Sequence, residues 1–210
     1  MVSVTRKSSR QTTRDAGDVM ESRLLAAVER LLETDTNFTA LSVERLAREA
    51  GISRATFYLY FKDKSDLIER LIRHVEDEVV SAGGMWFEHA EDADYEELKR
   101  AMHRFMDAYR EHRAVLRAAA ETAAYDEDVN EAYQHMMGRF RAETRAAVDR
   151  IAASGRAHDG LPTMLADVLS WSVDHCYVWH GARLEGEELD SFVNALTWIV
   201  WHTIFADDKP

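Results

Sequence analysis

The hydrophobic residues of this chain recur three and four positions apart, which is the spacing of one face of an α-helix. Residues 18–34 show the pattern well, because Leu24, Val28 and Leu31 fall on one face. Pro occurs only twice and Gly nine times, so few breakers interrupt it. The pattern predicts an all-α fold of about nine helices. The expected helices cover residues 18–34, 43–50, 54–60, 64–82, 94–112, 114–124, 126–151, 161–185 and 187–204.

The stretch 41–66 carries the clearest local signals. Ser42 stands directly before an apolar helical pattern, and Ser is a good helix N-cap. Gly51 marks the end of that helix, since Gly adopts the left-handed conformation that ends many helices. Ser53 then caps a second short helix that runs to about Tyr60. Two short helices joined by a Gly-containing turn predict a helix-turn-helix, whose second helix enters the DNA major groove.

The second of these helices also has the surface expected of a DNA reader. Phe57 and Phe61, four positions apart, can face inward and leave polar and aromatic side chains outside. Hydroxyl, guanidinium and ammonium groups suit contacts to phosphates and base edges. The alternative is an ordinary helical hairpin with a tyrosine-rich face. The candidate DNA-binding residues are Ser42, Ser53, Arg54, Thr56, Tyr58, Tyr60 and Lys64.

The segment GISRATFYLYFKDKSDL resembles the DNA-binding signature of the TetR family of one-component transcriptional regulators. The segment DAYREHRAVLRA and the helix start at Leu161–Pro162 are similar to the EthR-type branch of that family. The resemblance implies an N-terminal three-helix DNA-binding unit and a C-terminal helical domain for ligand binding and dimerisation. We therefore expect a basic arm without fixed structure at 1–17, a helix-turn-helix domain at 18–66 and the C-terminal domain at 67–210.

Composition limits the class of protein further. The 210 residues are 46% hydrophobic, which is typical of globular chains. The sequence contains no run of about 18 apolar residues, so we expect no membrane span. The N-terminus lacks the apolar segment of a secretory signal. The single Cys176 excludes an internal disulfide and is compatible with a reducing compartment. We expect a cytoplasmic protein.

The net charge of −12 is unevenly distributed along the chain. Residues 1–80 hold 13 basic and 14 acidic side chains, a balance of −1. Residues 81–210 hold 13 basic and 24 acidic side chains, a balance of −11, and the two parts add to −12. The acidity belongs to the part expected away from DNA. The nearly neutral N-terminal part argues against tight non-specific DNA binding.

The last two long helices carry apolar residues on more than one face. A helix that is apolar nearly all round is buried all round, which favours a partner subunit on one side. A homodimer also suits a helix-turn-helix, because a symmetric dimer reads two half-sites. The TetR resemblance implies the same interface; the alternative is a thicker monomeric core. The candidate interface residues are Leu165, Leu169, Cys176, Phe192, Leu196 and Ile199.

The middle of the chain is rich in Met and aromatic side chains, which suit an adaptable apolar ligand site. Such residues at helical spacing are also what an ordinary core contains. The resemblance to the EthR-type branch favours a ligand pocket. This chain has Ser170 and Asp174 where that branch tends to place amide groups, so the resemblance does not identify the ligand. The lining residues that the EthR-type resemblance implies are Met102, Phe105, Met137, Phe140, Thr144, Ser170, Asp174 and Trp201.

Other chemistry finds little support. His175 and Cys176 are adjacent on one helix and diverge, so with His180 they do not form the three or four convergent ligands of a metal site. No phosphate-binding loop or nucleophile motif occurs, so we expect no enzyme, no cofactor and no metal. We predict a repressor that leaves a palindromic operator when an apolar small molecule binds. The alternative is a helical ligand carrier or interaction module without specific DNA binding.

Overall fold

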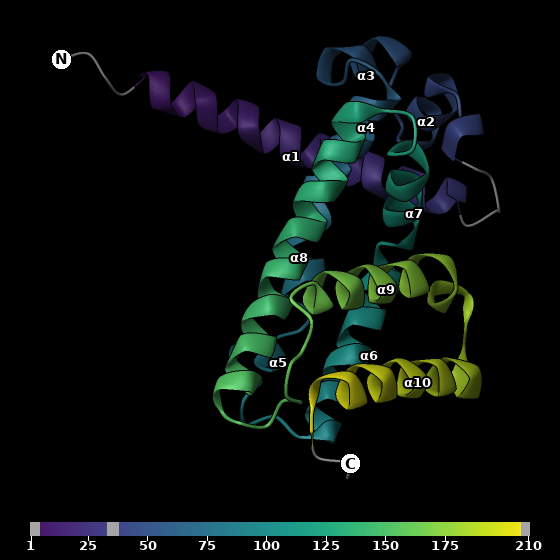
Figure 1. Ribbon diagram of the computed structural model, residues 1–210. Coiled ribbons are helices and arrows are strands. Elements are labelled where there is room, and N and C mark those ends of the chain that lie inside the picture. Colours follow the sequence, from purple (N-terminus) through teal and green to yellow (C-terminus); the bar gives the residue numbers. More distant parts are fainter. Residues whose placement is uncertain (1–4, 33–37, 207–210) are drawn as a thin grey trace. The chain divides into compact units, whose positions relative to one another are not determined.

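The computed structural model describes residues 5–32 and 38–206 (Figure 1). Regular structure in these residues is helical, apart from one isolated bridge between Ala157 and Phe205, so the all-α prediction is confirmed. None of the helices described has the length and apolar run that crossing a bilayer requires. The helices are α1 (Thr5–Leu32), η1 (Phe38–Ala40), α2 (Val43–Glu49), α3 (Arg54–Tyr60), α4 (Lys64–Ser81), α5 (Met85–Glu88), α6 (Tyr95–Glu111), α7 (Arg113–Thr122), α8 (Glu127–Ala153), α9 (Leu165–Trp179), η2 (Gly181–Arg183) and α10 (Gly186–Ile204).

The N-terminal helix differs from its prediction. Helix α1 already begins at Thr5, whereas the apolar pattern starts at residue 18 and an arm without fixed structure was expected before it. The residues between are mostly polar, so no apolar stripe reveals the helix in the sequence. Residues 1–4 of the expected arm lie outside the described part.

Helix α9 is shorter at both ends than the segment 161–185 suggested. Pro162 lies before the helix instead of in its first turn, and its carbonyl accepts a hydrogen bond from the backbone N–H of Leu165 at 3.0 Å. At the other end the helix stops at Trp179, ahead of Gly181 and the short helix η2. The short helix α5 was not predicted, because a single turn leaves no periodic pattern.

Contacts divide the chain into two compact units. The first contains residues 1–74 and 114–133, and the second contains residues 75–113 and 134–210. Helices α4 and α8 each contribute residues to both units. The functional boundary predicted after residue 66 is a different division and stays a prediction.

In the first unit, α1 packs on α2 and α2 packs on α3. Arg23 of α1 fixes the turn between α2 and α3, because its guanidinium donates to the carbonyls of Ala50 at 2.7 Å and Gly51 at 3.1 Å. Carbonyls at the end of a helix have no partner within the helix, so a basic side chain there satisfies them. The turn is thereby tied to α1.

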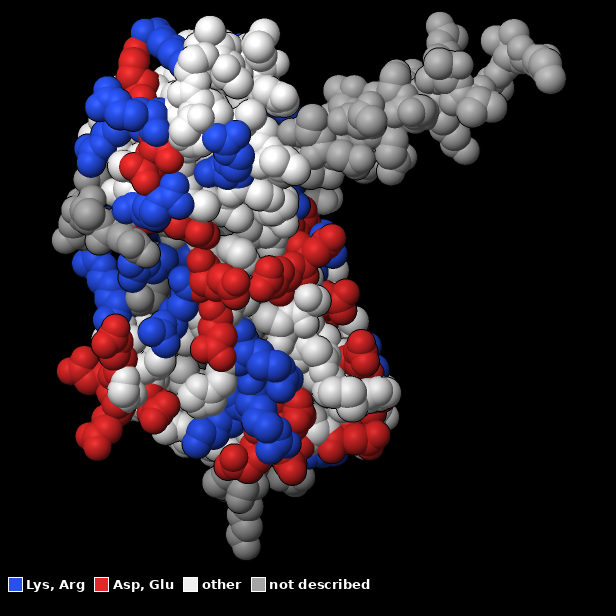
Figure 2. Space-filling view, turned by 180° about the vertical axis from the view of Figure 1, so that it is seen from behind, with Lys and Arg blue, Asp and Glu red and all other residues white. Residues whose placement is uncertain are grey.

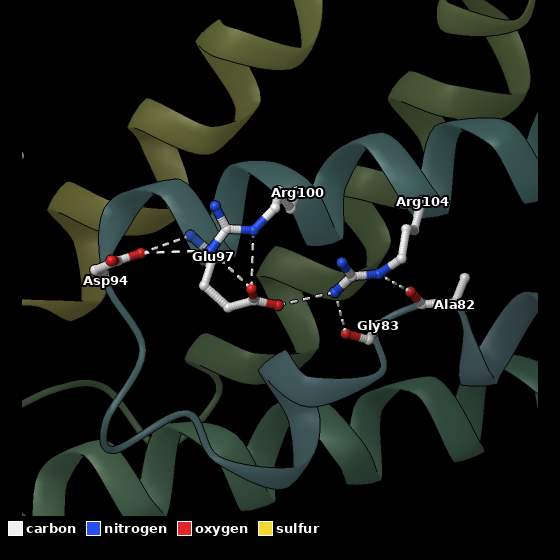
Figure 3. A network of polar contacts seen from close by, with 6 residues as sticks. All are labelled: Ala82, Gly83, Asp94, Glu97, Arg100 and Arg104. Atoms are coloured by element: carbon white, nitrogen blue, oxygen red, sulfur yellow. Dashed lines mark hydrogen bonds and ion pairs between the residues drawn. The ribbon is translucent and has the colours of Figure 1, made fainter.

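In the second unit, α5, α9 and α10 all pack on α6. Figure 3 shows the polar network that holds one end of α6. The carboxylate of Glu97 accepts hydrogen bonds from Arg100 and Arg104, both at 3.0 Å. Arg104 also donates to the carbonyls of Ala82 at 3.1 Å and Gly83 at 3.0 Å, just beyond the last residue of α4. The end of α4 is therefore fixed to α6.

The N-terminus of α6 offers a test of this local account. Asp94 is the N-cap of α6, because its side chain accepts a hydrogen bond from the backbone N–H of Glu97 at 2.7 Å. Asp94→Ala should lower the free energy of unfolding by about 1 kcal/mol, measured by urea denaturation. Asp92→Ala, at an exposed neighbour that caps no helix, should change it much less. Equal effects of the two variants would contradict the capping role.

Candidate DNA-binding surface, cavity and exposed apolar face

The helix-turn-helix is built from two side-chain caps and one glycine. Ser42 Oγ accepts from the backbone N–H of Arg45 at 3.2 Å, and Ser53 Oγ accepts from that of Thr56 at 2.9 Å. Gly51 has φ 66°, the left-handed conformation in which a larger side chain is strained. The start and stop signals predicted for α2 and α3 are confirmed. Because both serines cap helices, their hydroxyls position the motif before any contact with DNA.

Helix α3 is anchored by Phe57 and by Phe61 directly after it, both buried, with ring centroids 5.3 Å apart. This places the opposite side of α3 in solvent. Tyr58 is exposed there and packs edge-on against Phe57, with 5.5 Å between ring centroids. Leu59 is 81% exposed and was not among the predicted residues. The periodicity that turned Phe57 inward could have identified it, because Leu59 lies about half a turn away.

Arg54 is exposed at the start of α3 and is already held in place. It forms an ion pair with Glu44 of α2, and its guanidinium lies 5.5 Å from the ring centre of Tyr58. A hydrogen bond to Tyr58 and the charge of Glu44 raise the pKa of Arg54 above its ordinary value. The backbone hydrogen bond of Glu44 and, next to it, the Arg54 charge hold the pKa of the Glu44 carboxyl below its ordinary value. The predicted DNA contact Arg54 thus starts from a neutralised, oriented position.

Lys64 departs most from its predicted role. Its ammonium donates to three backbone carbonyls, at 3.4 Å to Phe38, 2.9 Å to Thr39 and 2.7 Å to Leu41. Partial burial lowers the pKa of Lys64. An ammonium has three protons to donate, so these contacts occupy it fully. Its first task is to hold the segment before α2, and a phosphate contact by Lys64 stays a prediction.

The remaining predicted residues of α3 are less accessible than expected. Thr56 and Tyr60 are half-buried, and the Thr56 hydroxyl shares a 2.8 Å hydrogen bond with that of Ser53. The face of the molecule in Figure 2 shows Lys and Arg interleaved with Asp and Glu over much of it. The nearly neutral balance of residues 1–80 fits a modest electrostatic attraction to DNA.

The second unit contains an apolar cavity. The volume that the centres of water molecules can occupy in it is ≈ 30 Å³, which is enough for about two or three waters. Five of the eight predicted lining residues meet there: Met102, Phe105, Phe140, Thr144 and Ser170. The wall is completed by residues outside that set of eight: Trp86, Phe87, Val148, Leu169, Val173, Val200 and Ile204.

Three predicted lining residues are buried away from this cavity. Asp174 instead accepts a hydrogen bond from the buried Tyr109 hydroxyl at 2.9 Å. Trp201 stacks on Phe205, with 3.9 Å between ring centroids, and Met137 is fully buried in the core. Helical spacing identified these side chains as inward-facing, but it does not tell a cavity wall from the packed core beside it. A ligand contact by these three residues stays a prediction.

The cavity wall has an aromatic part and one polar position. The rings of Phe87, Phe105 and Phe140 meet edge to face, with centroids 5.1–5.7 Å apart. The polar position of the wall is Ser170, whose hydroxyl donates a hydrogen bond to the Thr144 hydroxyl at 3.1 Å. An apolar molecule with a single hydrogen-bonding group would suit such a wall.

The predicted dimer residues differ in their exposure. Leu165, Leu169 and Leu196 are buried within the chain, and Cys176 and Phe192 are half-buried. Of the six, only Ile199 is exposed among the residues described. Both faces of α9 and α10 are apolar, so the pattern could not decide which face points outward. The large apolar side chains left in solvent on these helices are Val168 and Trp179 of α9 and Trp198 and Ile199 of α10.

Capped short helices α2 and α3, with an exposed α3 face, define a helix-turn-helix DNA-binding protein. Residues 24–71 match the model of bacterial regulatory proteins of the tetR family. Residues 98–206, about half of the chain, match that of the C-terminal domain of the transcriptional regulator EthR. The chain belongs to the TetR family, with a C-terminal domain of the EthR type. This is a family of DNA-binding transcriptional regulators, not of enzymes.

Curated relatives agree with this assignment. The EthR regulator of Mycobacterium tuberculosis is 35% identical over 154 residues, which is 73% of this chain and 71% of the relative. That of Mycolicibacterium smegmatis is 32% identical over 159 residues, 74% of this chain and 71% of the relative. Both are described as HTH-type transcriptional regulators. The alternative of a ligand carrier without a DNA-binding role is therefore not favoured.

Solved structures show the same fold at low sequence identity. The TetR-family regulator PfmR of Thermus thermophilus is 18% identical with a TM-score of 0.68, over 86% of this chain and 97% of that one. The fatty acid degradation regulator FadR of Bacillus halodurans is 14% identical with a TM-score of 0.67, over 86% and 93%. At these identities the likeness concerns the fold alone.

The geometry of α3 leads to a test of the DNA-binding residues. Thr56→Ala and Tyr58→Ala should each weaken binding to the operator by about 1–3 kcal/mol through a lost phosphate or base contact. Fluorescence anisotropy with labelled operator measures this, and thermal unfolding shows that the fold persists. Tyr125→Ala is a matched control, since Tyr125 is exposed outside the helix-turn-helix. Wild-type affinity in both α3 variants would disprove the assignment of α3 as recognition helix.

Proposed function

We propose that this protein is a dimeric repressor that leaves a palindromic operator when an apolar small molecule binds in the second unit. The observation that carries the proposal is that one chain holds both a capped helix-turn-helix and an apolar cavity, two of whose wall rings crowd Gly83, two residues after α4. TetR-family regulators bind operator DNA and ligand effectors and are typically dimeric, which supports each part. As a DNA-binding regulator it would act in the cytoplasm.

The contacts of α3 with DNA would come from Arg54, Thr56, Tyr58 and Leu59. Tyr58 and Arg54 suit phosphates and acceptor edges, while the exposed Leu59 suits the methyl group of a thymine. Glu44 must release Arg54, or orient it, for the guanidinium to reach a phosphate. Each half-site contact would then be modest, so operator affinity would depend on two protomers binding together.

Dimerisation would use the exposed apolar face of α9 and α10. Val168, Ser172, His175 and Trp179 recur four, three and four positions apart, which places them on one stripe of α9. Trp198, of which 56% is exposed, and Ile199 lie on the exposed side of α10. Large apolar side chains that gather in one exposed patch mark an interaction surface, whereas single ones are ordinary.

The effector would act through the aromatic wall on the end of α4. Gly83 has no room for a side chain, because a Cβ there would lie 2.5 Å from the Phe87 ring and 2.8 Å from that of Phe105. A ligand larger than the present cavity would displace these rings. Because both rings lie close to Gly83, their displacement would act on the backbone there. Since α4 runs unbroken from Lys64 to Ser81, a shift at one end is carried along the helix. The ligand must prefer the shifted state for the operator to be released.

The whole proposal is tested by selecting bound sequences from random DNA with the full chain. A two-fold symmetric consensus is expected, and apolar compounds that raise the melting temperature should release the selected DNA. Compounds that raise the melting temperature but leave DNA binding unchanged would refute the release step. An asymmetric consensus or the absence of any enriched sequence would refute the palindromic operator.

The dimer face has its own prediction. Trp198→Glu should shift the protein from dimer to monomer in sedimentation velocity at micromolar concentration, because an unpaired charge in an apolar interface costs several kcal/mol. Met85→Glu is a matched control, since Met85 is equally exposed but lies on α5. A wild-type chain that remains monomeric at all concentrations, or a Trp198→Glu dimer of unchanged strength, would contradict the assignment.

Gly83 allows the coupling between the cavity wall and operator binding to be tested without changing a residue of the helix-turn-helix. Gly83→Ala should overpack the aromatic wall by about 1–3 kcal/mol and weaken operator binding in the absence of any effector. Gly138→Ala is the control, since an added Cβ there meets only the end of Arg141 at 3.7 Å. If Gly83→Ala lowers the melting temperature but binds the operator with wild-type affinity, the route through α4 is wrong.

A further inference from the structure

Three side chains with metal-binding atoms meet where α4 passes the end of α6. They are Glu78 of α4, Glu111 at the last position of α6, and His112, the residue that caps α6. One ligand atom from each lies within 4.8 Å of the other two. All three belong to the second unit and none lines the cavity. The proposed function assigns no role to these three residues.

The three side chains differ in exposure, and this difference suits the binding of an ion. His112 is 6% exposed, so its imidazole is held by its surroundings. Its Nε2 lies 3.1 Å from Oε2 of Glu78. Two atoms that each bind one metal ion at about 2.1 Å stand about 3.0–3.4 Å apart at right or tetrahedral angles. The separation between Nε2 and Oε2 already has this value, and the exposed Glu111 needs only to rotate inward.

A simple hydrogen-bonded pair would not account for the third residue. His112 and Glu78 can satisfy each other, but Glu111 adds a second carboxylate within 4.8 Å of both. Two carboxylates at that distance repel each other, and a divalent cation between them removes the repulsion. The site also lies at the C-terminal end of α6, where the helix dipole favours positive charge.

We propose that Glu78, Glu111 and His112 bind a divalent transition-metal ion, with zinc as the probe of choice. Imidazole with carboxylates suits Zn²⁺ and its neighbours, whereas Mg²⁺ prefers oxygen ligands and water. The two carboxylates balance the charge of the ion, and water would complete its coordination. The ion would join α4 to the end of α6, one turn before the Ala82 carbonyl that Arg104 holds. This proposal does not rest on the proposed function.

The test is equilibrium dialysis of the untagged full chain against Zn²⁺ alone, with Co²⁺ absorption spectra as a second readout of coordination. A single ion per chain is expected. Glu78→Gln and Glu111→Gln change exposed side chains, so they should fold normally and weaken binding at least about tenfold. Zn²⁺ should also raise the melting temperature of the wild type but not that of the double variant.

Two matched variants separate this site from other histidines and acids of the surface. Glu88→Gln removes an exposed glutamate of α5, and His180→Gln removes an exposed histidine after α9. Both should bind Zn²⁺ as the wild type does. Zinc affinity that survives in the Glu78→Gln/Glu111→Gln double variant, or falls with His180→Gln instead, would overturn the proposal. So would the absence of saturable binding to the wild type.

Discussion

Basic side chains that donate to backbone carbonyls at helix ends fix neighbouring elements to each other in both units. A helix leaves its last carbonyls without partners, and their negative dipole attracts a cation. Arg23 satisfies two carbonyls after α2, Lys64 three around η1, and Arg104 two after α4. Each cation comes from another helix, so one contact both ends an element and fixes it to its neighbour. The helices of each unit are thereby held as blocks whose ends cannot fray independently.

This arrangement gives physical content to the proposed signal. Arg104 ties the end of α4 to α6, while the Phe87 and Phe105 rings press on Gly83 at the same end. A ligand that displaces the rings therefore acts on a backbone segment that is already fixed, so strain cannot be absorbed locally by loose side chains. At the other end of α4, the three carbonyls on Lys64 connect the helix to the segment before α2. The proposed route thus runs through contacts that have few alternative arrangements.

The sequence predicted best what is decided locally. Ser42, Gly51 and Ser53 specify the helix-turn-helix because caps and a left-handed glycine act within a few residues. The faces of α9 and α10 could not be assigned, since Leu196 and Ile199 are equally apolar and only tertiary contacts turn one inward. The cavity was half predicted: Phe105 and Phe140 follow from helical spacing, whereas Trp86 and Phe87 come from a single helical turn without periodicity. The task of Lys64 depends on carbonyls more than 20 residues away and leaves no pattern.

The distribution of charge bears on how such a regulator could be specific. Arg54 is paired with Glu44 and the ammonium of Lys64 is occupied by backbone carbonyls, so these two cations are less available to phosphates. Non-specific binding arises mainly from phosphate neutralisation, and it weakens as the number of such contacts falls. In the proposed dimer, recognition would rest more on base edges and on the pairing of two half-sites. In the proposed dimer, specificity would therefore depend on the spacing of the two α3 helices more than on the affinity of either one. That is the property an effector acting through α4 would change.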